Sequence, residues 1–186
     1  MSQDPAGPDG MLAQAIASTR AEQDGDAAFL FALFCRSRAP GEDLAFFDPA
    51  LREQLMRSQF IGQSASYRAA FPDARYEIVE QGGAPAGRIV WERSGEALRL
   101  IDIALLPDRR RRGIGTGLIR SLMARAREAG LPLRLSVAMH NGDALRLYQR
   151  LGFSPTESAP PMIEMEWRGA ADGELVFSSP RPGLPR

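Results

Sequence analysis

The spacing of hydrophobic residues changes along the chain from a helical to an alternating pattern and back, and it predicts two helices before any strand. Residues 25–36 combine aromatic and aliphatic side chains on a dense face, and Asp24 is available as an N-cap. A second helix is predicted over residues 48–70, because Asp48-Pro49 is a typical helix start and Phe71-Pro72 a typical stop.

Three strand-like segments follow, at residues 75–81, 86–92 and 97–106. Gly82-Gly83 separates the first two, and Ser94-Gly95 separates the second from the third. Short glycine-containing turns of this kind connect neighbouring antiparallel strands. The segment therefore predicts an antiparallel meander that ends at Pro107.

The remaining elements alternate between helix and strand. An amphipathic helix is predicted over residues 113–129 and a strand over 133–138. A helix over 141–151 and a strand over 162–167 follow, while Gly130 and Gly152 provide the C-terminal stops of the two helices. The order predicts an α/β fold with a mixed sheet, partly antiparallel and partly crossed over.

Composition limits the number of domains. The chain has 186 residues, of which 44% are hydrophobic and 25% charged, as expected for one globular domain. Residues 1–10 and 169–186 are rich in Pro, Gly, Ser and Asp. Such segments bury too little apolar surface to offset the entropy of ordering. We therefore expect a disordered N-terminal segment, a single domain over residues 11–168, and a flexible C-terminal tail.

Charge and hydropathy exclude several classes of function. The formal net charge is zero, which argues against nucleic acid as a partner. Every one of the 23 basic residues is Arg. No segment reaches the roughly 18 apolar residues of a membrane span, and the polar start does not resemble a secretion signal. We expect a cytoplasmic protein that binds no membrane. Cys35, the only cysteine, lies in an apolar run and is interpreted as packing material.

The segment Arg110-Arg111-Arg112-Gly113-Ile114-Gly115-Thr116-Gly117 stands between a strand and an amphipathic helix. The unpaired amides of a helix start attract anions, glycines allow close approach, and Arg adds charge-assisted hydrogen bonds. The alternative is a basic, solvated turn without a ligand. A dinucleotide site fits poorly because the acidic residue expected about 20 positions later is missing, and a P-loop is excluded because the chain has no Lys.

Arg110, Gly113 and Gly115 match the Arg/Gln-x-x-Gly-x-Gly/Ala pyrophosphate loop of the GCN5-related N-acetyltransferases, which this segment resembles. Arg111 is a departure, because many members of that family have Gly at this position. The resemblance extends over roughly residues 12–167 and implies a largely antiparallel sheet that is splayed between its fourth and fifth strands and flanked by helices.

A second motif strengthens the resemblance. Residues 141–153 match the family's Asn-x-x-Ala-x-x-x-Tyr-x-x-x-Gly-Phe pattern at every named position, including Asn141 and Tyr148. Periodicity alone interprets Tyr148 as a core residue. The resemblance instead implies that its phenol protonates the departing coenzyme A thiolate, as a group of pKa about 10 can. The alternative role for Asn141 is a helix N-cap, which is compatible with holding the cofactor.

The resemblance implies acetyl-coenzyme A as cofactor and a small-molecule or peptide amine as the acceptor, acetylated by direct attack in a ternary complex. The strand edge at Ala104 and Leu105 is expected to bind pantetheine as an added strand. The residues expected to hold the rest of the cofactor are Arg110, Arg111, Arg112, Gly113, Ile114, Gly115, Thr116 and Asn141. We identify no metal-binding residues, and expect a monomer or a homodimer.

The acceptor side is less well defined. Asp102, Glu77 and His140 are candidates for the base that deprotonates the amine, and each also has an ordinary structural interpretation. Gln59, Gln63 and Tyr67 form a polar stripe at helical spacing that could line a substrate cleft or simply a half-exposed helix edge. An alternative function is a catalytically silent acyl-coenzyme A-binding or sensing module of the same fold.

Overall fold

The computed structural model describes residues 17–37 and 47–169. The expected N-terminal segment and almost all of the expected tail, together with the first residues of the expected domain, lie outside these ranges. None of the described helices is both long and apolar enough to cross a membrane.

The described helices largely follow the hydrophobic pattern. They are α2 (Ala27–Ser37), α3 (Pro49–Ala70), α4 (Ile114–Glu128) and α5 (Gly142–Arg150), with 3-10 turns η1 (Asp24–Asp26) and η3 (Pro107–Arg109). The start of α3 is as predicted, because the Asp48 side chain accepts a hydrogen bond from the Ala50 amide and Pro49 occupies the first turn. The prediction for Asp24 was wrong: Gln23 is the N-cap of η1, and the Asp26 carboxylate accepts a hydrogen bond from the Gln23 amide.

Seven strands form one sheet in the order β1-β2-β3-β4-β5-β7-β6. The strands are β1 (Ser18–Ala21), β2 (Arg75–Gln81), β3 (Ala84–Arg93), β4 (Leu98–Leu105), β5 (Leu133–Ala138), β6 (Ser154–Ala159) and β7 (Met162–Trp167). All neighbours are antiparallel except β4 and β5, which are parallel. The predicted mixed sheet and its meander at β2–β4 are confirmed.

The outermost strands, β1 and β6, were not predicted. Their sequences, Ser-Thr-Arg-Ala and Ser-Pro-Thr-Glu-Ser-Ala, have no hydrophobic alternation, and β6 contains Pro155. An edge strand does not need hydrophobic alternation, because little of its surface is buried. It also tolerates proline, because one of its edges is unpaired. These strands are held by backbone pairing to β2 and β7.

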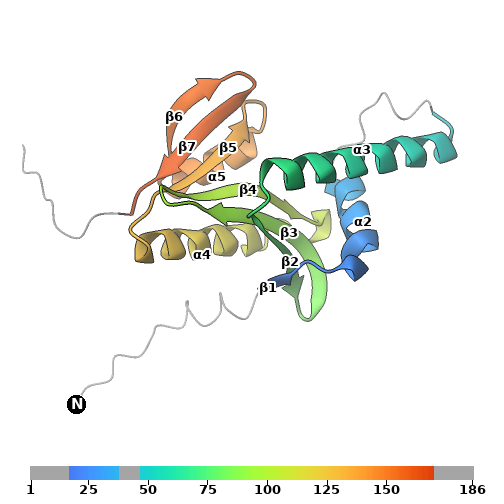
Figure 1. Ribbon diagram of the computed structural model, residues 1–186, viewed down its shortest axis with the longest axis horizontal. Coiled ribbons are helices and arrows are strands. Elements are labelled where there is room, and N and C mark those ends of the chain that lie inside the picture. Colours follow the sequence, from blue (N-terminus) through green and yellow to red (C-terminus); the bar gives the residue numbers. More distant parts are fainter. Residues whose placement is uncertain (1–16, 38–46, 170–186) are drawn as a thin grey trace, which may run out of the picture.

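Helices cover the two faces of the sheet differently. On one face, α4 and α5 pack Ile119, Leu122 and Tyr148 onto strand residues such as Ile89 and Leu135 in the main core cluster. On the other face lie α2 and α3 (Figure 1). Because side chains alternate along a strand, each central strand contributes one set of residues to the core and another set to the α2–α3 face.

The sheet opens between β4 and β5. These strands pair only from Leu98 with Leu133 to Leu100 with Leu135, at the beginning of both strands. Beyond Leu100 they diverge, and Figure 1 shows β5 and β7 turned away from the direction of β3 and β4. The splay expected between the fourth and fifth strands is therefore present, and it leaves one edge of β4 free toward its C-terminal end.

Candidate active site

The free edge of β4 leads directly into the start of α4. After η3, Arg111 and Gly113 adopt left-handed backbone conformations, with φ of 57° and 80°. Gly113 is the N-cap of α4, and the first intrahelical hydrogen bond runs from the Gly117 amide to the Gly113 carbonyl, at 2.9 Å. The amides of Ile114, Gly115 and Thr116 therefore have no partner within the helix, and they lie at its positive end.

The arginines near this helix start differ in whether they bind neighbouring residues. Arg110 is held against β4, because its Nε donates a hydrogen bond of 2.9 Å to the Leu105 carbonyl oxygen. Arg109 pairs with Asp108 and donates a hydrogen bond to Gln81. Arg111 and Arg112 are exposed. Arg110 is exposed as well, so all three arginines bring positive charge to this helix start, and Arg110 also ties the loop to the strand.

The register of β4 decides which backbone groups face the open edge. The Leu106 amide donates to the Ala86 carbonyl of β3, and Ala104 lies opposite Arg88. Because backbone groups of alternate residues point to opposite edges, those of Ala104 point to β3 and those of Ile103 and Leu105 to the open edge. The sequence-based prediction for this edge included Leu105 but not Ile103. Strand alternation puts residues 103 and 105 on the same edge, and the pairing of β4 with β3 decides that this edge is the open one.

Tyr148 lies in α5 and packs into the core beside Phe153, with ring centroids 5.7 Å apart. It is 8% exposed. Burial raises the pKa of Tyr148 to about 12, and the negative charge of Asp102 adds to the rise. The phenol therefore keeps its proton throughout the neutral range. Asn141 caps the same helix by accepting a hydrogen bond from the Ala144 amide at 3.2 Å.

Two neighbouring cavities lie between the sheet and the helices α2 and α3. The smaller, about 120 Å³, is lined among others by Gln63, Arg88, Asp102 and Ala104. The larger, about 510 Å³, is lined among others by Glu22, Tyr67 and Arg68, and it shares Leu30, Phe60 and Arg88 with the smaller. Of the predicted polar stripe, Gln63 and Tyr67 line these cavities and Gln59 does not.

The three candidate bases occupy different places. Asp102 lines the smaller cavity and forms an ion pair with Arg88, at 2.6 Å. Glu77 lies opposite Ile89 in the β2–β3 pairing and so faces the α4 side of the sheet. His140 is exposed in the turn after β5. Only Asp102 combines a position in a cavity with an effect on Tyr148.

Cys35 offers no competing chemistry. The thiol is half-buried, and burial raises its pKa above the ordinary value, which disfavours the reactive thiolate. In the part of the chain that the structure describes, no three or more His, Cys, Asp or Glu residues are grouped to hold a metal ion.

A mixed sheet that opens between two parallel central strands, with an unpaired helix start at the end of the opening, defines the class of acyl-coenzyme A N-acyltransferase folds. A family model described as the acetyltransferase (GNAT) family matches residues 43–153. The chain belongs to the GNAT acetyltransferase family.

Solved structures share the fold at low sequence identity. The PaiA N-acetyltransferase of Thermoplasma acidophilum in complex with coenzyme A is 16% identical, with a TM-score of 0.62 over 82% of this chain and 99% of that chain. The ribosomal-protein-S18-alanine N-acetyltransferase of Escherichia coli is 20% identical, with a TM-score of 0.59 over 87% of this chain and 99% of that chain. A search of curated proteins finds no match.

Proposed function

We propose that the protein is an N-acetyltransferase that uses acetyl-coenzyme A to acetylate a primary amine by direct attack in a ternary complex. The observation that carries the proposal is the run of unpaired amides at the start of α4, placed at the end of the free edge of β4. Membership of the acetyltransferase family and the likeness to an acetyltransferase in complex with coenzyme A support the choice of cofactor.

The residues at this place fit a diphosphate followed by an extended amide chain. The amides at the start of α4 supply donors, Arg111 and Arg112 supply positive charge, and Gly115 leaves space, since an added Cβ would meet only Leu105 Cδ1, at 3.7 Å. We assign the amide chain to the backbone of Ile103 and Leu105. The cofactor-binding residues in this proposal are Ile103, Ala104 through its methyl group, Leu105, Arg110, Arg111, Arg112, Gly113, Ile114, Gly115, Thr116 and Asn141.

Acetyl-coenzyme A supplies an acyl group that is activated as a thioester. Tyr148 holds a proton on its Oη at neutral pH, because its pKa is about 12, and it can deliver that proton to the departing sulfur. A primary amine has a pKa near 10 and must lose a proton to attack. Asp102 lines the smaller cavity, and we assign to it the role of accepting that proton, directly or through water.

A pair of glycine substitutions tests the cofactor site. Gly115→Glu puts a carboxylate where the diphosphate would bind. The substitution should not unfold the protein, because a negative charge in the first turn of a helix is stabilising. Gly95→Glu is the control, because an added Cβ there meets nothing within 4 Å. Calorimetric titration with coenzyme A should show a loss of affinity of at least about 100-fold for Gly115→Glu and little change for Gly95→Glu. Absence of saturable binding to the folded wild type would refute the proposal.

Release of thiol in the presence of an amine panel tests catalysis. We expect release that depends on both the amine and acetyl-coenzyme A. Tight binding of acetyl-coenzyme A without amine-dependent release would instead support the acyl-coenzyme A-binding or sensing module.

A further inference from the structure

The larger cavity contains a carboxylate with unused hydrogen-bonding capacity. Glu22 follows β1, lines this cavity, and has a side chain that is only 12% exposed. Its Oε1 accepts a hydrogen bond from Arg68 Nη2, whereas its Oε2 is buried without a hydrogen-bond partner among the described residues. A buried carboxylate oxygen that lacks a donor is costly, and it therefore marks a position where a further donor is favoured.

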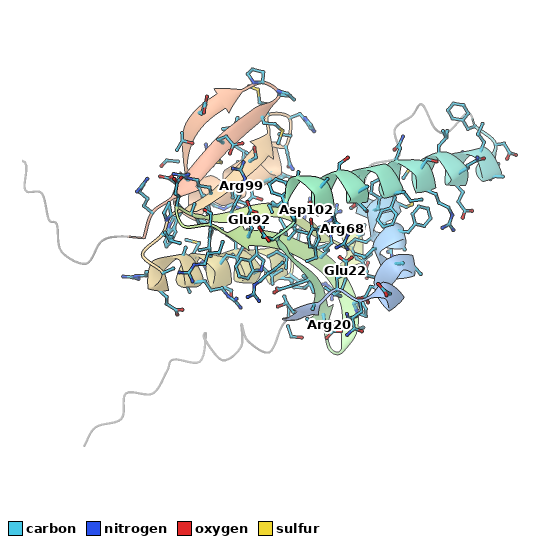
Figure 2. All side chains as sticks on the ribbon, viewed as in Figure 1. Arg20, Glu22, Arg68, Glu92, Arg99 and Asp102 are labelled. Carbon is cyan, nitrogen blue, oxygen red and sulfur yellow. The ribbon has the colours of Figure 1, made fainter. Side chains whose placement is uncertain are left out.

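The partner of Glu22 sits at the rim of the cavity. The Arg68 side chain is 56% exposed, and its Cζ lies 4.5 Å from the centroid of the Tyr76 ring (Figure 2 labels Glu22 and Arg68). A carboxylate beside the face of an aromatic ring is an arrangement that binds cations. Glu22 and Tyr76 thus form a cation site, and a side chain of the protein itself occupies it from the solvent side. Because the Arg68 side chain is more than half exposed, water can hydrogen-bond to its guanidinium group when a ligand displaces it from Glu22.

The other charges of the two cavities leave this site available to a cation. Arg88, which lines both cavities, is paired with Asp102. Asp24 adds a second carboxylate to the lining of the larger cavity. When Arg68 is displaced, Glu22 loses its counter-ion, so the ligand that replaces it must carry positive charge.

We propose that the acceptor is a small diamine, whose second ammonium group binds between Glu22 and Tyr76 while its reacting amine lies beside Asp102. This inference rests on the proposed function for the reacting end. Arg68 acts as a place-holder that the second ammonium group displaces. The two cavities adjoin, because Leu30, Phe60 and Arg88 line both, and in this proposal one flexible alkyl chain extends from the first to the second.

Matched acceptors test the charge preference. Linear diamines from diaminopropane to diaminohexane are compared with the monoamine and the ω-amino acid of the same length. We expect kcat/KM for the best diamine to exceed that of its monoamine at least about tenfold, the size of one charge-assisted hydrogen bond, and the amino acid to be the poorest. Equal values for diamine and monoamine overturn the inference. A preference for the amino acid also overturns it, because the cavity would then bind a carboxylate through Arg88.

Two variants separate a ligand site from a structural ion pair. Glu22→Gln should bring the diamine-to-monoamine ratio close to one. Arg68→Ala should lower KM for the diamine, because the place-holder is removed. A merely structural pair predicts that both variants lose stability and that neither changes the ratio. Glu53→Gln is the control, since it breaks a pair with Arg57 on α3 whose two side chains are more than half exposed, and it should leave the ratio unchanged.

Binding is also measured without turnover, by calorimetric titration of the coenzyme A-saturated protein with the best diamine. Saturable binding that weakens in Glu22→Gln and strengthens in Arg68→Ala supports the diamine site even if no amine is acetylated. In that case only the proposed acetyltransferase function is refuted. No binding to the wild type, or binding that neither variant changes, overturns the inference while amine-dependent thiol release can still support the proposed function.

Discussion

Gly87 of β3 is the residue whose substitution should disturb the candidate active site most directly from within the fold. It is buried and lies opposite Leu105. A Cβ added to Gly87 would lie 2.3 Å from the Ala104 carbonyl oxygen and 2.6 Å from Leu105 Cδ2. Both distances are shorter than any ordinary contact, and the nearer atom belongs to the backbone, which cannot rotate away as a side chain can.

Gly87→Ala therefore requires β3 and β4 to separate locally by at least about 0.7 Å, or the pairing of Arg88 with Ala104 to weaken. Overpacking of this kind costs about 1–3 kcal/mol, and a strained backbone hydrogen bond adds about 1 kcal/mol. Alanine also restricts the unfolded chain, which offsets about 0.4–1 kcal/mol. We expect the free energy of unfolding to fall by about 1–3 kcal/mol.

Urea unfolding followed by circular dichroism measures this loss, and titration with coenzyme A measures its effect on the free edge of β4. Affinity should fall together with stability, because the displaced Ala104 carbonyl belongs to the same peptide unit as the Leu105 amide, which faces the open edge. Gly95→Ala is the control, since its added Cβ has no atom within 4 Å, and its free energy of unfolding should change by less than about 0.5 kcal/mol. The reasoning is refuted if Gly87→Ala behaves like this control in both measurements.

Further predictions concern Tyr148 and Arg111. Tyr148→Phe should keep the packing against Phe153 and the affinity for coenzyme A but lower kcat about 10²- to 10⁴-fold in a thiol-release assay, and unchanged turnover would leave Tyr148 a packing residue. The pKa of the buried phenol is raised to about 12 from an ordinary 10.0, so the unfolded chain loses this proton at a lower pH than the folded protein does. In urea titrations, the stability of the wild type relative to Tyr148→Phe should therefore be constant below pH 10 and fall as the pH rises toward 12. A parallel pH dependence of the two proteins would contradict the raised pKa. Because Arg111 has a φ of 57°, Arg111→Gly should be more stable than Arg111→Ala by about 1 kcal/mol in urea unfolding. At most positions the Ala variant is the more stable of the two, and that result at Arg111 would show that its backbone is not strained.

Residues that act locally made much of the fold predictable. Asp48-Pro49 favours a helix start through contacts with neighbouring residues alone, and Gly82-Gly83, with φ of 61° and 77°, allow the tight turn between β2 and β3. The left-handed conformation of Arg111 gives a physical reason for the Gly that the resembled loop often has at this position, and the Arg of this chain adopts the same conformation.

Features that depend on distant partners could not be predicted from a single sequence. The edge strands β1 and β6 exist only because β2 and β7 are beside them. The ion pair of Glu22 with Arg68 joins residues 46 positions apart, and neither residue belongs to a motif. The preference for Ile103 over Ala104 at the open edge follows from which neighbour pairs with β4, and hydrophobicity does not encode that pairing because both residues are apolar.

The two interpretations of Tyr148, as a core residue and as a general acid, are not alternatives. Its burial in the core raises its pKa to about 12, so the phenol keeps its proton at neutral pH and can donate it in a hydrogen bond to negative charge that develops beside it. Asp102 increases this effect by its negative charge. Asp102 lies on β4 beyond Leu100, where β4 and β5 no longer pair. A sheet that closed fully would fill this opening with backbone hydrogen bonds. The opening of the sheet therefore removes pairing between its two central strands. In the proposed function, the acyl group binds at this opening, with Tyr148 and Asp102 acting on the two sides of the reaction.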